Sequence, residues 1–215
     1  MRLFRDAAAR PDEMRIERET LLAELMKAKR YHEAWEVWAV GRYVGENPRR
    51  NGLASLTDGG FEQGLSFTEI NFGWRLNPEK PMVLVSVDAH EPFADTTSLQ
   101  IRWEGKSSPS VYTAAQLVLV EPGKRYRLTF AARTNELVTG GVPEVAVLSD
   151  FEGQLLASVP IPQGTTAWKN YTLEFNSLAE SRIVLVVIRR KACQSMPCPA
   201  FGTTWFDAFT LQANS

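Results

Sequence analysis

The stretch Leu56–Gly64, LTDGGFEQG, decides how this chain folds, together with Thr203–Leu211, TTWFDAFTL, near its end. The Gly-Gly pair in the first stretch permits a tight or positive-φ backbone directly before an aromatic anchor, Phe61. Glu62 stands beside that anchor. We expect the first stretch to be the opening strand of a β-sandwich and the second to be its closing strand, with the two meeting in space. The alternative interpretation of the first stretch is an ordinary loop that leads into a strand.

Short segments of alternating apolar and polar residues fill the chain between these two stretches, and Gly, Pro, Asn and Asp turns separate them. The clearest segment is Arg125–Arg133, in which Tyr126, Leu128 and Phe130 share one face. The other predicted strands are Met82–Ala89, Ser98–Trp103, Tyr112–Val120, Val145–Ser149, Leu155–Val159, Trp168–Phe175, Ile183–Arg189 and Trp205–Leu211. About ten short strands without helical pattern between them predict a mainly β protein, a jelly-roll antiparallel β-sandwich.

The N-terminal region has a different, helical periodicity. We predict a short α-helical hairpin with its linker at residues 1–50 and the sandwich domain at residues 51–215. The second helix runs from about Tyr31 to Tyr43 and follows the first after a short break, which predicts an antiparallel pair. Trp35 and Trp38 lie on one side of it, so we expect the hairpin to pack against the sandwich or a partner chain.

Composition excludes several classes of partner. The chain has 215 residues and a net charge of −1, with 24 Lys and Arg against 25 Asp and Glu. No overall positive field is present to attract nucleic acid or an anionic membrane surface. No apolar run approaches the roughly 20 residues that a membrane-spanning helix needs. We therefore expect neither a nucleic-acid partner nor a membrane span in this chain.

Two cysteines, Cys193 and Cys198, lie close together in KACQSMPCPAFG. A short-loop disulfide between them would imply an oxidising compartment, and two reduced cysteines are the alternative. The histidines are only His32 and His90, and no second Cys or His pair completes a zinc-binding set.

The order of several motifs carries a resemblance to a known family. The chain shows GGFE, GWR, SLQI, VEPGKRYRLTFAAR, TTAW and WFDAF in turn. Over about residues 55–212 this series resembles the jelly-roll carbohydrate-binding modules of the xylan- and β-glucan-binding type, in the galactose-binding-like superfamily. The segment AKRYHEAWEVW, followed by ENP, resembles the turn and second helix of a single tetratricopeptide repeat. The combination is similar to sandwiches that follow such repeats in some bacterial envelope or exopolysaccharide-related proteins.

The resemblance also implies a location and a metal. It implies an extracytoplasmic domain (periplasmic, envelope or secreted) that is part of a longer chain, because no signal peptide is visible here; a cytoplasmic protein is the alternative. In the family a structural calcium ion often joins the first and last strands, and the matching residues are Glu62 and Asp207. The family's second closing acid is Ala208 in this chain. The alternative role of the two acids is to cap turns or face solvent.

Glycan binding needs aromatic faces for pyranose rings and planar polar groups for hydroxyls. The polar candidates on the predicted non-core faces are Gln100, Arg102, Gln116, Arg133 and Arg189. Trp74 and Arg75 are the candidate platform and its neighbouring guanidinium, although core packing explains Trp74 equally well. We expect Trp103, Trp168 and Trp205 to be buried, and ion pairs on a solvated face are the alternative role of Arg133 and Arg189.

Motifs for catalysis are missing from the sequence. It contains no G-x-S-x-G, no phosphate-binding loop and no H-E-x-x-H. We therefore predict a non-catalytic module that binds a polysaccharide or oligosaccharide, such as a bacterial exopolysaccharide or cell-wall chain. The alternative is a protein-interaction or scaffold domain at the end of a tetratricopeptide array, with a protein partner bound through the helical hairpin.

Overall fold

The computed structural model describes residues 15–40, 56–63, 72–77, 82–106, 108–109, 111–149, 153–195 and 197–214. The chain divides into two compact units, Met1–Leu53 and Ala54–Ser215. No helix within the described ranges is long and apolar enough to cross a membrane.

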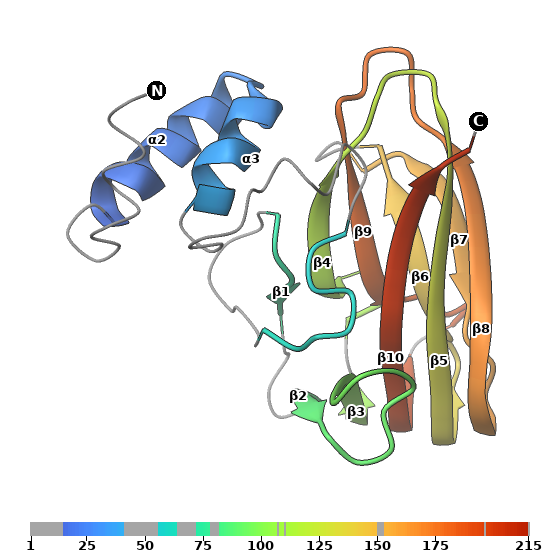
Figure 1. Cartoon of the computed structure of the whole chain (residues 1–215). Coiled ribbons are helices and arrows are strands. Elements are labelled where there is room, and N and C mark those ends of the chain that lie inside the picture. The colour runs from blue at the N-terminus through green and yellow to red at the C-terminus, as the bar shows by residue number, and fades with distance from the viewer. Residues whose placement is uncertain are drawn as a thin grey trace. The chain divides into compact units, whose positions relative to one another are not determined.

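In the described part of the first unit, residues 15–40, two helices, α2 (Arg15–Lys27) and α3 (Tyr31–Val40), pack against each other (Figure 1). An acidic residue in the first turn of α2 and Lys27 in its last turn complement the helix dipole. Lys29 has a φ of 56° in the short connection, and the chain reverses there. The predicted pair of helices is confirmed, with Trp38 buried and Trp35 half-buried. The predicted extension to Tyr43 lies outside the described residues.

The second unit is a β-sandwich, and its described residues form two five-stranded sheets in which every strand pair is antiparallel, as predicted. One sheet, here the β9 sheet, has the order β1-β4-β9-β6-β7, and the other, the β10 sheet, has the order β2-β3-β10-β5-β8 (Figure 1). The strands are β1 (Arg75–Leu76), β2 (Val83–Asp88), β3 (Ser98–Lys106), β4 (Tyr112–Leu119), β5 (Arg125–Thr139), β6 (Pro143–Leu148), β7 (Leu155–Pro160), β8 (Gly164–Asn176), β9 (Ile183–Arg190) and β10 (Pro199–Ala213).

The hydrophobic core lies between the two sheets. Tyr126, Leu128 and Phe130 of β5 all belong to it, as their alternation predicted. The ring of Phe130 stacks on Tyr171 at 5.3 Å and on Phe209 at 5.1 Å between ring centres. Such aromatic pairs contribute about 0.5–1.5 kcal/mol each beyond their buried area. These ring contacts therefore link β8 and the closing strand, β10, to β5 within the core.

The opening stretch is a turn and not a strand, which corrects the first interpretation. Residues 56–63, here the opening turn, adopt bends, and Asp58 and Phe61 have φ values of 52° and 62°. The Asp58 carboxylate accepts the backbone N–H groups of Glu62 and Gln63 at 2.6 and 3.1 Å, so the side chain competes with strand pairing. The loop that was the alternative interpretation is the structure observed.

The two ends of the domain nevertheless meet as expected. The Phe209 N–H of β10 donates a hydrogen bond to the Gly59 carbonyl oxygen at 2.9 Å. A Cβ at Gly59 would lie 2.0 Å from the Phe209 carbonyl oxygen, so only glycine permits this approach. The predicted closing strand is confirmed, since Trp205–Leu211 lies within β10.

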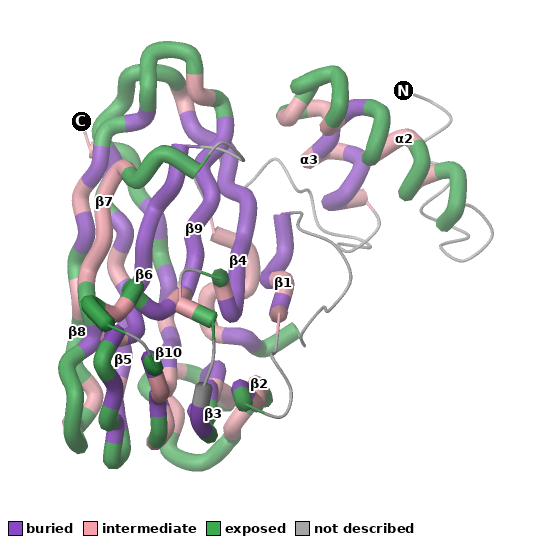
Figure 2. Tube along the Cα trace, turned by 180° about the vertical axis from the view of Figure 1, so that it is seen from behind, coloured by how far each residue is buried: buried purple, intermediate pink, exposed green. Residues whose placement is uncertain are grey.

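The two sheets differ in what their outer faces expose. Leu117 of β4 and Val187 of β9 alternate with core residues and yet are 1% and 0% exposed. Figure 2 shows β4, β6 and β9 as almost continuously buried. In the β10 sheet, the buried residues of β8 alternate with exposed or half-buried ones. An accessible polar face is therefore a property of the β10 sheet within the described residues.

A disulfide between Cys193 and Cys198 follows β9, which confirms one of the two predicted states of these cysteines. Its Cα atoms are 5.7 Å apart. The neighbouring Arg190 is 1% exposed, and its guanidinium donates to the Cys198 carbonyl oxygen at 3.0 Å and to Thr139 Oγ1 at 2.9 Å. The disulfide loop is thereby held against a buried cation that the sequence pattern did not reveal.

Candidate functional site

Four side chains from four strands meet on the outer face of the β10 sheet. Register places Trp205 of β10 between Arg133 of β5 and Gln100 of β3, and Trp168 of β8 lies beyond Arg133. The guanidinium carbon of Arg133 is 4.4 Å from the ring centre of Trp205 and 5.2 Å from that of Trp168. Contacts of this kind between a cation and an indole face are attractive. We call these four residues the Trp205 cluster.

The two tryptophans of the cluster correct the prediction that they are buried. Both are half-buried on the outer face, whereas Trp103 is 2% exposed and lies in the core as predicted. The reason is parity along β10, where Phe206 is the residue that enters the core. An adjacent Trp-Phe pair in a strand always sends one ring outward, and periodicity alone did not identify which one.

Asp88 at the end of β2 orients the cluster. Its Oδ2 accepts hydrogen bonds from Trp205 Nε1 at 2.7 Å and from Gln100 Nε2 at 3.0 Å. Burial by itself would raise the pKa of Asp88, but hydrogen bonds from the His90 N–H and Trp205, with the positive charge of Arg133, outweigh it and lower the pKa. The carboxylate is therefore ionised near neutral pH and fixes the indole and the amide in place.

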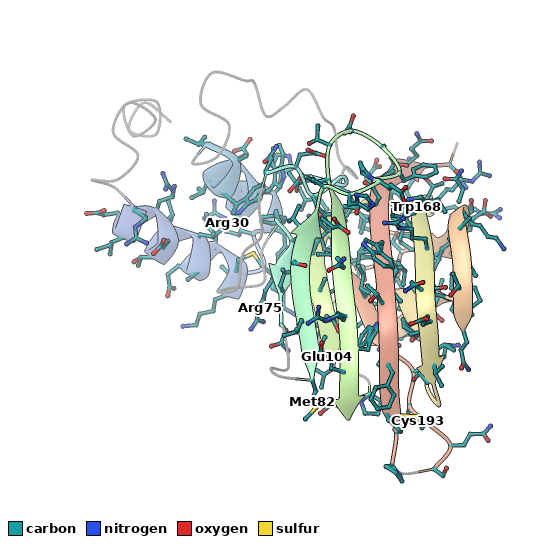
Figure 3. All side chains as sticks on the ribbon, turned by 90° about the horizontal axis from the view of Figure 1, so that it is seen from below. Arg30, Arg75, Met82, Glu104, Trp168 and Cys193 are labelled. Carbon is teal, nitrogen blue, oxygen red and sulfur yellow. A yellow bond between two sulfur atoms is a disulfide. The ribbon has the colours of Figure 1, made fainter. Side chains whose placement is uncertain are left out.

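The loop of residues 89–97 borders the cluster on one side. Trp168 Nε1 donates to the Glu91 carbonyl oxygen at 2.9 Å, and Arg133 pairs with the Glu91 carboxylate at 3.1 Å. The Phe93 ring lies 5.8 Å from the Trp168 ring. Figure 3 shows Trp168 among the side chains that project from the strands of this sheet. These contacts hold the loop of residues 89–97, here called the wall loop, beside the two half-buried indoles.

Glu62 and Asp207, the two predicted calcium ligands, hold the wall loop in place through hydrogen bonds. Asp207 Oδ2 accepts the N–H groups of Phe93 and Ala94, both at 2.9 Å. Glu62 Oε1 accepts the N–H groups of Thr96 and Thr97 at 3.0 and 2.9 Å. Asp207 thus ties the middle of the loop of residues 89–97 to β10, and Glu62 ties its C-terminal end to the opening turn.

The two acids converge, and their pKa values move in opposite directions. A Cβ at Gly60 would lie 3.6 Å from Glu62 Cγ and 3.7 Å from Asp207 Oδ1. Burial raises the pKa of Asp207, the N–H donors oppose this, and the charge of Glu62 adds to the rise. The hydroxyl of Thr96 is the main group that lowers the pKa of Glu62. The two carboxyl groups therefore lie close enough for the charge of Glu62 to act on the pKa of Asp207.

This arrangement does not fit a calcium ion as it stands. Calcium takes six to eight oxygen ligands, and the described ranges hold no group of three or more His, Cys, Asp or Glu that could bind a metal. Glu62 Oε1 and Asp207 Oδ2 each already accept two N–H groups. The two acids act in the structure as hydrogen-bond acceptors for a loop, and the calcium ion stays a prediction.

Two other candidates belong to the core and not to a binding surface. Trp74 is 3% exposed, its ring lies 5.1 Å from those of Phe61 and Phe209, and its Nε1 donates to the Asp58 carbonyl oxygen. Gln116 is fully buried. Its amide exchanges two hydrogen bonds with the backbone of Thr57, at 3.0 and 2.8 Å. Both side chains hold the opening turn, and for Trp74 this is the core packing that was its alternative role.

The remaining candidates separate between the two sheets. Arg75 donates to the Tyr112 hydroxyl at 3.1 Å, and Arg189 pairs with Glu144 at 2.9 Å; both belong to strands of the β9 sheet. Arg102 lies on the outer face of β3, two residues from Gln100, in an exposed ion pair with Glu104. The structure therefore brings together Gln100, Arg102 and Arg133, and leaves Arg75 and Arg189 elsewhere.

Comparison with solved structures shows which class of protein shares this fold. A CBM4 carbohydrate-binding module superposes with a TM-score of 0.53 at 13% identity, covering 74% of this chain and 100% of that one. A CBM61 module in complex with β-1,4-galactotriose has a TM-score of 0.50 at 20% identity, covering 75% and 99%. An arabinose-bound α-L-arabinofuranosidase has a TM-score of 0.51 at 18% identity, covering 76% and 27%.

The sandwich therefore has the fold of carbohydrate-binding modules, and such modules are its structural neighbours. No protein-family model and no curated protein sequence matches this chain. At these identities the likeness concerns the fold alone. The tetratricopeptide resemblance and the type of glycan stay predictions.

Proposed function

We propose that this protein is a non-catalytic glycan-binding module whose ligand lies on the outer face of the β10 sheet, across the Trp205 cluster. The observation that supports this most directly is the pairing of two half-exposed indoles with one guanidinium between them. Indole faces suit the apolar faces of pyranose rings, and the planar guanidinium and amide suit pairs of sugar hydroxyls. The shared fold of the structural neighbours agrees with a carbohydrate ligand.

The wall loop gives the proposed site a rigid side. Asp88 holds Trp205 and Gln100, and Asp207 holds the backbone of the loop. A site fixed before binding loses little conformational entropy when the ligand arrives. We propose a bacterial exopolysaccharide or cell-wall polysaccharide as the ligand, and an extracytoplasmic location as part of a longer chain.

A glycan array with the wild-type protein tests the proposal, followed by titration calorimetry on the glycan that is bound. Trp205→Ala and Arg133→Ala should each lower the affinity at least tenfold, which corresponds to about 1.4 kcal/mol. Arg125→Ala is the matched control, because Arg125 is an exposed arginine on the same strand, paired with Glu174. Absence of binding to any glycan, or equal losses in Arg125→Ala and Arg133→Ala, would contradict the proposal.

A further inference from the structure

A second exposed apolar patch lies on the same face of the β10 sheet. Phe201 of β10 and Val138 of β5 are direct register partners, and they are 51% and 64% exposed. Exposed apolar residues that are scattered singly need no explanation, but neighbouring ones on a surface otherwise polar indicate a contact site. We call these two residues the Phe201 patch.

The backbone beside the patch is irregular in a way that sets its position. The pairing of β10 with β5 shifts between Phe201 and Thr203, and Gly202 has a φ of 101°. A Cβ at Gly202 would lie 2.4 Å from the carbonyl oxygen of Glu136, which itself has a φ of 50°. Bulges of this kind bend a strand and re-aim its side chains. Here the bulge lies directly beside Phe201, at the end of the exposed face.

The patch and the Trp205 cluster form one row along β10. Phe201, Thr203 and Trp205 alternate with residues that face the core, and their partners on β3 are Glu104, Arg102 and Gln100. Four residues of an antiparallel strand span about 13 to 14 Å at about 3.4 Å per residue. This is longer than a single pyranose ring. The middle of the row is polar, since it holds Thr203 with Arg102 on one side and Asn135 on the other.

We propose that the ligand is an extended polysaccharide chain that runs along β10, with one sugar ring on the Trp205 cluster and another, further along the chain, on the Phe201 patch. This inference rests on the proposed function and adds the direction of the ligand along β10 and a second contact, at the Phe201 patch. A straight row of separated apolar contacts suits a chain of equatorially linked pyranoses, because such linkages keep the polymer extended. The polar side chains between the two contacts meet the hydroxyls of the intervening rings.

The test is titration calorimetry with β-1,4-linked gluco-oligosaccharides and xylo-oligosaccharides, from the disaccharide to the hexasaccharide. The wild-type affinity should rise with chain length and then level off once both contacts are occupied. Phe201→Ala should lose about tenfold for the hexasaccharide and leave the disaccharide affinity unchanged, in line with the loss of one partly buried aromatic contact. Trp205→Ala should weaken binding at every length.

Leu155→Ala is the matched control, because Leu155 is 50% exposed and lies on β7 of the other sheet. It should bind as the wild type does. Equal hexasaccharide affinities of Phe201→Ala and wild type, a disaccharide as tight as a hexasaccharide, or no binding of either series would overturn this inference. In each of those cases a glycan-array signal that Trp205→Ala abolishes leaves the proposed function standing, and a blank array removes both.

Discussion

Replacing Asp207 tests the hydrogen-bonded anchor of the wall loop. Asp207 is fully buried, and its carboxylate accepts three backbone N–H groups, from Phe93 and Ala94 at 2.9 Å each and from Ala208 at 2.6 Å. Hydrogen bonds to a charged group contribute about 1.5–3 kcal/mol each, and donors left unsatisfied in a buried position cost a similar amount. The burial that raises the pKa of this group offsets part of the gain.

From these terms we expect Asp207→Ala to lower the free energy of unfolding by about 3 kcal/mol. For a domain of this size that corresponds to a fall in Tm of about 6–12 °C. The assay is a thermal melt at neutral pH, with Glu104→Ala as the control, since Glu104 is an exposed acid on β3 whose ion pair with Arg102 lies on the surface. An Asp207→Ala variant that melts with the wild type would refute the reasoning, because the three N–H groups would then have other partners.

The same melts examine calcium when they are repeated with EDTA and with millimolar calcium. An ion that binds only the folded state stabilises it by about 2.7 kcal/mol at a hundredfold excess over Kd. A calcium-dependent rise in the Tm of the wild type that Asp207→Ala abolishes would support the predicted ion. Equal melting temperatures in both buffers would mean that Glu62 and Asp207 act through hydrogen bonds alone.

The pH dependence of Asp207 has a definite sign. The pKa of its carboxyl in the folded state lies above the ordinary value of 3.8. Protonation of this carboxyl therefore adds a pH-dependent part to the stability, which is fully present below that value and is lost as the pH rises through the raised pKa. The backbone N–H groups that the carboxylate accepts supply the part that remains at neutral pH. Asn does not titrate, so the Tm of the wild type minus that of Asp207→Asn should fall as the pH rises from about 3.5 to about 7. A difference that grows over this range would contradict the raised pKa.

Three further experiments test the opening turn and the disulfide. Gly59→Ala should lower the free energy of unfolding by about 3 kcal/mol or prevent folding, because its Cβ would lie 2.0 Å from a carbonyl oxygen; Gly60→Ala, with no contact below 3.6 Å, should melt near the wild type. Gln116→Leu leaves a backbone N–H and C=O of the opening turn unpaired, and denaturant unfolding should show a loss of about 2–4 kcal/mol. Replacing Cys193 and Cys198 with Ser removes a short-loop crosslink and should cost about 2 kcal/mol; an unchanged Tm would show that the loop is held without the bond.

Local patterns in the sequence determined most of the strands and both helices. Alternation in Arg125–Arg133 correctly predicted β5 and its core face, because a strand with one face in the core records its orientation residue by residue. The stretch Trp205–Leu211 was correctly predicted as a strand, β10, but the prediction that Trp205 faces the core was wrong. The helical spacing after Tyr31 likewise predicted α3. The resemblance to carbohydrate-binding modules, based on the order of the motifs, predicted that Glu62 and Asp207 lie near each other. Both residues lie beside Gly60 in the structure.

The tertiary structure decided the site. Gln100, Arg133, Trp168 and Trp205 come from four strands, and only the order β3-β10-β5-β8 makes them neighbours. Which ring of the Trp205-Phe206 pair turns outward depends on which face of β10 meets the other sheet, a property of packing that the alternating letters alone do not contain. The burial of Trp74 and Gln116 also depends on the tertiary structure. The opening turn that buries them is held by contacts with residues far along the chain.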